Sequence, residues 1–111
     1  MGSTQPSKKP RDPVIHQKIE HIKSEVDNLI SKIQKQTSYN PTRSDVEKYA
    51  VQINDVIMHN RSSVRQFESF LKAAIIDLTE IPEMHPQMQR ISFITALKDA
   101  SQKLQLFLDC C

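Results

Sequence analysis

The stretch DPVIHQKIEHIKSEVDNLISKIQKQ, residues 12–36, decides the fold class of this chain. Asp12 is a good N-cap residue, and Pro13 suits the first helical position because its missing N–H would have no helical partner there. The helix should end before Pro41, since a proline biases the preceding residue away from helical geometry. Steps of three and four place the apolar residues on one stripe of an amphipathic helix: Ile15, Ile19, Ile22, Val26, Leu29, Ile30 and Ile33.

The next apolar stripe begins after Pro41. Ser44 and Glu47 have the spacing of a capping box, in which two side chains satisfy each other's unpaired backbone N–H groups. A heptad phase then continues from Asn60 to Ala74, so this stretch predicts helix from about residue 44 to about residue 81. The stripe starts with Val46, Tyr49, Ala50, Ile53, Val56 and Ile57 and continues with Val64, Phe67, Leu71 and Leu78.

The alternative to one long middle helix is a break near Asn60. This break would fall in the stretch NRSS, residues 60–63, because Ser63 and Gln66 form a second candidate capping box there. An unbroken helix over 44–81 would be roughly 57 Å long, whereas the first helix reaches only roughly 35 Å. The excess length would overhang the bundle, so we expect a kink or a break near Asn60.

Two prolines in IPEMHPQMQ, residues 81–89, predict the last connection. No sustained alternation of apolar and polar residues predicts a strand. The fold class is therefore all-α, an antiparallel bundle of three long helices, or of four if the middle helix is split near Asn60. The last helix runs to the end of the chain on Ile91, Ile94, Leu97, Ser101, Leu104, Leu108 and Cys111, with Phe93, Ala100 and Phe107 beside them.

Composition limits the class of protein. The 111 residues suffice for one domain, and 38% hydrophobic with 25% charged residues is ordinary for a soluble chain. Residues 1–12, MGSTQPSKKPRD, predict a flexible basic tail, which leaves 13–111 as the helical bundle domain. No apolar run is long enough to span a membrane. Beyond the tail the charges nearly cancel, which disfavours a nucleic-acid surface.

Catalysis has little support in the sequence. The single glycine, Gly2, excludes a phosphate-cradling glycine loop and a dinucleotide fingerprint. The histidines are scattered, and a metal site would need ligands that their spacing does not supply. We therefore expect a protein that is not an enzyme and has no cofactor and no metal ion. The four histidines are His16, His21, His59 and His85.

The two cysteines, Cys110 and Cys111, are adjacent in the sequence. Adjacent residues rarely pair with each other and no third cysteine exists, so we predict a reducing compartment, the cytoplasm. The nucleus is the alternative, because SKKPR, residues 7–11, has the composition of a weak nuclear-localisation patch.

Three stretches resemble the BAG domains, which are nucleotide-exchange co-chaperones of 70-kDa heat-shock proteins. DPVIHQKIEHIKSEVDNLISKI resembles their first helix, which commonly opens with His-Pro, an apolar residue and then Lys-Ile-Glu-x-Ile. FESFLKAAIIDLTEI is similar to their second helix, and QKLQLFLDCC to the close of their third. The matches come in the family's order and cover about half of the chain.

The resemblance implies a three-helix bundle whose second and third helices bind the ATPase domain of the chaperone. Binding would promote nucleotide release by favouring the open state of that domain. The implied contact residues are Glu68, Asp77, Lys98 and Gln105, with Arg90 as a stand-in for an arginine of the family.

Two positions depart from the family. Thr79 stands where the family has an aspartate, although Asp77 and Glu80 flank it. Leu97 stands where the family has an arginine, and a leucine cannot make bidentate hydrogen bonds to a carboxylate. The stretch SDVEKYAVQINDVIMHN, residues 44–60, also lacks a counterpart in the short form of the family. The fold could therefore be inherited while chaperone binding is weakened or lost.

The alternative function is a helical adaptor or dimeric scaffold with no chaperone role. Such a protein would offer an apolar groove between helices to an amphipathic partner helix, or would pair with itself. The stripes at 15–33 and 46–57 are compatible with a coiled coil, so the sequence leaves self-association open.

Overall fold

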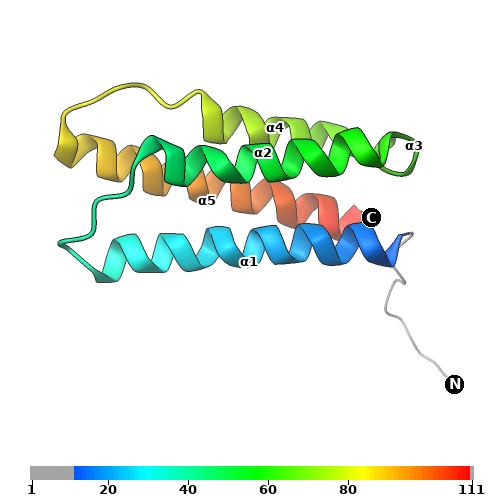
Figure 1. Ribbon diagram of the computed structural model, residues 1–111, viewed down its shortest axis with the longest axis horizontal. Coiled ribbons are helices and arrows are strands. Elements are labelled where there is room, and N and C mark those ends of the chain that lie inside the picture. The colour runs from blue at the N-terminus through cyan, green and yellow to red at the C-terminus, as the bar shows by residue number, and fades with distance from the viewer. Residues whose placement is uncertain (1–11, 111) are drawn as a thin grey trace, which may run out of the picture.

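A computed structural model describes residues 12–110, and over that range the protein is all-helical, as predicted. Successive long helices run in opposite directions (Figure 1), each packs against the next, and α1 also packs against α5. Of the predicted basic tail, residues 1–12, all but Asp12 lies outside the described residues, as does Cys111. The helices are α1 (Pro13–Lys35), α2 (Arg43–His59), α3 (Arg61–Val64), α4 (Glu68–Thr79) and α5 (Pro86–Cys110).

The middle of the chain reverses direction after Asn60. This residue is the C-cap of α2 and the N-cap of α3, a single helical turn whose Val64 is buried in the core. After the reversal α4 packs against both α2 and α5. Segment 44–81 is therefore a helical hairpin, so the predicted break near Asn60 is confirmed and the unbroken middle helix is wrong.

Helix α1 begins and ends as the sequence predicts. The carboxylate of Asp12 accepts hydrogen bonds from the backbone N–H groups of Val14 (3.1 Å) and Ile15 (3.2 Å). Pro13 is the first helical residue, and the helix ends at Lys35, ahead of Pro41. The apolar stripe predicted for this helix is buried in full.

Helix α2 uses a different capping box from the one predicted. Thr42 is its N-cap and forms the box with Asp45, whereas Ser44 and Glu47 lie inside the helix. Both pairs have the required spacing, and the earlier pair lets two more residues join the helix. The second candidate box is also wrong, because Ser63 lies inside α3 rather than at an N-cap.

The predicted stripe of α5 is buried at Leu97, Ser101 and Leu104 but not at its first residue. Phe93 is also buried, whereas the side chain of Ile91 is 56% exposed. The predicted stripe began with two successive steps of three residues. Each such step leaves the side-chain direction about 60° short of a full turn, so Ile91 points away from the buried face. Helix α5 also begins at Pro86, five residues before the predicted stripe.

Candidate partner-binding surfaces

The five residues implicated in partner binding lie on α4 and α5 but do not form one surface. Glu68 and Asp77 are nine residues apart in α4. That separation is about two and a half helical turns, so the two side chains leave the helix on opposite sides. Glu68 lines a pocket with residues of α2, and Asp77 lines a groove with residues of α5.

The groove between α4 and α5 is lined by both acidic and apolar side chains. Its volume is about 430 Å³. Asp77, Glu80 and Asp99 supply carboxylates, and the side chain of Ile76 is 51% exposed. Asp77 forms an ion pair with Lys103 of α5, which fastens the two helices together at the groove. The remaining lining residues are Ile81, Pro82, Ser92, Thr95 and Ala96.

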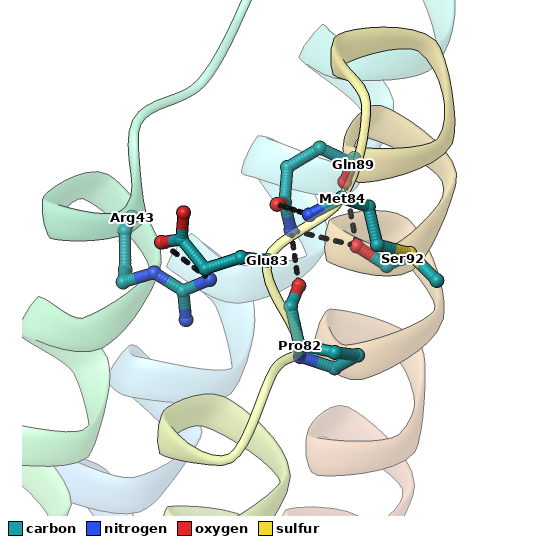
Figure 2. A network of polar contacts seen from close by, with 6 residues as sticks. All are labelled: Arg43, Pro82, Glu83, Met84, Gln89 and Ser92. Atoms are coloured by element: carbon teal, nitrogen blue, oxygen red, sulfur yellow. Dashed lines mark hydrogen bonds and ion pairs between the residues drawn. The ribbon is translucent and has the colours of Figure 1, made fainter.

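Hydrogen bonds of Gln89 hold the connection that borders this groove (Figure 2). Its side-chain carbonyl oxygen accepts from the backbone N–H of Met84 (2.8 Å). Its side-chain NH2 group donates to the backbone carbonyl of Pro82 (3.1 Å) and to the hydroxyl of Ser92 (2.9 Å). Pro82 and Ser92 are also lining residues of the groove. These hydrogen bonds therefore tie the rim of the groove to the start of α5.

The guanidinium of Arg90 is already hydrogen-bonded to backbone carbonyls at and just after the end of α1. It donates to the backbone carbonyls of Ile33 and Tyr39, and to that of Gln36 at 2.9 Å. The last carbonyls of a helix have no partner within the helix, so Arg90 satisfies the carbonyl of Ile33, which would otherwise need water. The carbonyl of Gln36 also accepts from the backbone N–H of Tyr39 at 2.9 Å. A partner carboxylate would have to compete with these three acceptors for the guanidinium.

Lys98 and Gln105 lie on one exposed face of α5, about two helical turns apart. Gln105 donates to a carboxylate oxygen of Asp109 at 2.9 Å. Leu97 is fully buried, so the position where the BAG family has an arginine faces the core. Thr79 is exposed, and its hydroxyl donates to the backbone carbonyl of Ile75 at 2.8 Å.

The pocket between α2 and α4 was not predicted from the sequence, although Glu68, one of its lining residues, was predicted as a partner contact. Its volume is about 440 Å³, and Arg61, Arg65 and Lys72 line it together with Glu68. Steps of four, three and four residues separate these side chains, which is the spacing of one helical face and could have revealed the cluster. The other lining residues are Asn54, Ile57, Met58 and Ser62.

Electrostatics in this pocket favour the charged form of Glu68. The Lys72 ammonium donates to the Glu68 carboxylate at 2.7 Å. This hydrogen bond, together with the charges of Lys72, Arg61 and Arg65, holds the pKa of Glu68 below its usual value.

No family model matches the chain, and no curated protein or solved structure matches it. Within residues 12–110, no group of three or more histidine, cysteine or acidic side chains could hold a metal ion. None of the helices in that range is both long enough and apolar enough to cross a membrane. The BAG resemblance therefore rests on the three sequence stretches that carry it.

Proposed function

We propose that the protein is a non-enzymatic helical module that binds the ATPase domain of a 70-kDa heat-shock chaperone through the α4–α5 groove. The observation that carries this proposal is the lining of the groove, in which the half-exposed Ile76 occurs together with the carboxylates of Asp77, Glu80 and Asp99. Carboxylates together with an apolar contact suit a partner surface that presents basic residues together with an apolar one.

The choice of a chaperone as the partner comes from the resemblance. The groove lies between the helices that contain the stretches similar to the second and third BAG helices. Nucleotide release would follow if the bundle binds the open state of the ATPase domain more tightly than the closed state. On this proposal Asp77 is a central contact, Lys98 and Gln105 are contacts on the exposed face of α5, and Glu68 lies away from the groove.

The deciding experiment measures nucleotide release from an isolated heat-shock ATPase domain loaded with a fluorescent nucleotide. We expect an excess of this protein to accelerate release. The double substitution Glu80→Arg and Asp99→Arg should reduce that acceleration by about tenfold or more, because it reverses charges that face the partner. A protein that neither accelerates release nor forms a complex would refute the chaperone proposal.

The double substitution Glu20→Arg and Asp55→Arg is the matched control for this experiment. Glu20 on α1 and Asp55 on α2 are exposed and do not line the α4–α5 groove, so their reversal makes the same change in net charge outside the proposed surface. Release should be accelerated as well by this variant as by the unaltered protein. An equal loss in both variants would show that overall charge, and not the α4–α5 groove, governs binding.

A helical adaptor without a chaperone role is the second candidate, and the α1–α2 groove supports it. This groove has a volume of about 480 Å³, and Val14, Ile22 and Val56 give it an apolar part. Val14 is 59% exposed, so a partner helix or a second copy of the chain would find apolar surface there. Sedimentation velocity over a range of concentrations separates a monomer from a self-associating scaffold.

A further inference from the structure

The pocket between α2 and α4 carries positive charge that the proposed function does not use. Arg61, Arg65 and Lys72 line it with one carboxylate, that of Glu68, so three cations and one anion leave a net charge of +2 in the lining. We propose that this pocket binds a phosphate monoester group on a phosphorylated side chain of a protein partner.

The two arginines are available to an incoming anion. Arg61 donates to the sulfur of Met58 at 3.2 Å, and a thioether is a weak acceptor that an oxyanion would displace. Arg65 is exposed and forms no ion pair within residues 12–110. Lys72 is already paired with the carboxylate of Glu68. The pocket therefore contains one paired cation and two arginines that can bind an anionic ligand.

The donors in the pocket suit a phosphate group. A guanidinium presents parallel N–H groups that match two phosphate oxygens, and hydrogen bonds between charged groups are the strong ones. The side chains of Asn54 and Ser62 line the same pocket and add neutral donors. Glu68 lies in the first turn of α4, where the helix dipole adds further positive potential.

The same observations favour a peptide over a nucleic acid. A nucleic acid presents closely spaced phosphates and requires a row of cations. Here the positive charge is confined to one end of α4, because Asp77 and Glu80 lie at its other end. Met58 is half exposed beside the arginines and offers an apolar contact to a residue next to the phosphorylated one.

Glu68 competes with the proposed ligand for Lys72. Glu68→Gln removes the competing charge and should raise the affinity for a phosphate group. The BAG resemblance makes Glu68 a chaperone contact, and on that view the same substitution lowers chaperone binding. Since the phosphate pocket and the α4–α5 groove are lined by different residues, either proposal can fail while the other stands.

The test is fluorescence anisotropy of a labelled alanine- and glycine-rich peptide with one phosphoserine, titrated with the whole protein at low ionic strength. We expect the phosphopeptide to bind at least about tenfold more tightly than its unphosphorylated twin. Arg65→Glu should abolish the difference, and Glu68→Gln should raise the affinity about threefold or more. Arg65→Gln is the milder second variant, and circular dichroism establishes that each variant is folded.

Lys35→Glu is the matched control, because Lys35 ends α1 at the opposite end of the bundle from α3 (Figure 1). This variant should keep the preference for the phosphopeptide. Equal binding of both peptides to the unaltered protein, or full binding to Arg65→Glu, would overturn the proposal. Tighter binding of a single-stranded RNA, or equally tight binding of free phosphoserine, would overturn the assignment to a protein partner.

Discussion

The hydroxyl of Ser101 on α5 donates a hydrogen bond of 2.6 Å to a carboxylate oxygen of Asp27 on α1. Ser101 is the one polar residue that is buried within residues 12–110, and it sits among apolar side chains of the core. The second carboxylate oxygen of Asp27 accepts from Lys23 at 2.9 Å. This bond adds a directional contact between α1 and α5, because apolar contacts alone are not directional.

Ser101→Ala should lower the free energy of unfolding by about 1 kcal/mol, the usual net contribution of one hydrogen bond. Asp27 is partly exposed and keeps Lys23, so no buried charge is left unpaired. Urea denaturation provides the measurement. Ser31→Ala on the exposed side of α1 is the control and should be neutral or slightly stabilising. Equal stability of the Ser101 variant and the unaltered protein would mean that the bond contributes nothing.

Arg90→Ala should destabilise the bundle by about 2–4 kcal/mol, because it leaves the carbonyls of Ile33 and Tyr39 without this donor, while that of Gln36 keeps the N–H of Tyr39. Arg90→Lys should recover only part of this loss, since an ammonium lacks the planar fork of donors. Hydrogen exchange should show faster exchange in the connection between α1 and α2. Lys98→Ala, on the same helix and exposed, is the control. A similar loss in both variants would contradict a specific role for Arg90.

The sequence predicts those parts of the fold that depend on local pattern. The stripes of α1 and α2 are buried as expected, and the cap at Asp12 forms, because side chains three and four residues apart share a helical face whatever surrounds them. The interruption at Asn60 was expected from the length of the stretch, whereas the predicted local cap does not form, because Ser63 lies inside α3. The consequence of the interruption, a full reversal that turns α4 back onto α2, depends on packing between distant residues, which no local pattern contains.

The same distinction applies to the candidate site. Helical periodicity alone would have placed Glu68 and Asp77 on opposite sides of α4, and Arg61 and Arg65 on the side of Glu68. The engagement of Arg90 with the end of α1 was not predictable from sequence, because those carbonyls lie more than fifty residues away along the chain.

The reversal at Asn60 predicts a short distance between the start of α2 and the end of α4. Spin labels at positions 48 and 79, both exposed, would be roughly 46 Å apart along a continuous helix. In the hairpin α4 runs back alongside α2 (Figure 1), so double electron–electron resonance should give less than about half of that value. The label sites need Lys48→Cys and Thr79→Cys in a chain whose own cysteines are replaced by serine.

A distance near the larger value would mean that the middle helix is continuous and that the four helices do not pack as described. A second pair of labels, at positions 48 and 59, is the internal control. Both positions lie in α2, so their separation should be close to the roughly 16 Å of an unbroken helix in either case.

The cap of α2 predicts a pH dependence of stability. A hydrogen bond from the backbone N–H of Thr42 lowers the pKa of Asp45 from its usual value. A carboxylate whose pKa is lower in the folded state stabilises the fold above its unfolded pKa, and that contribution is lost as the pH falls through the folded pKa. Asp45→Ala should therefore cost about 1 kcal/mol or less near neutral pH, because the group is partly exposed, and less in strong acid.

Urea denaturation of both proteins at neutral pH and at about pH 2 tests this prediction, since the stability difference should shrink toward the acid end. Glu47→Ala is the matched control, because Glu47 lies two residues further along α2 and takes no part in the cap. It should change stability little at either pH. A larger loss from Glu47→Ala than from Asp45→Ala would indicate that the box of Ser44 and Glu47 caps the helix in solution, and that α2 begins later than Arg43.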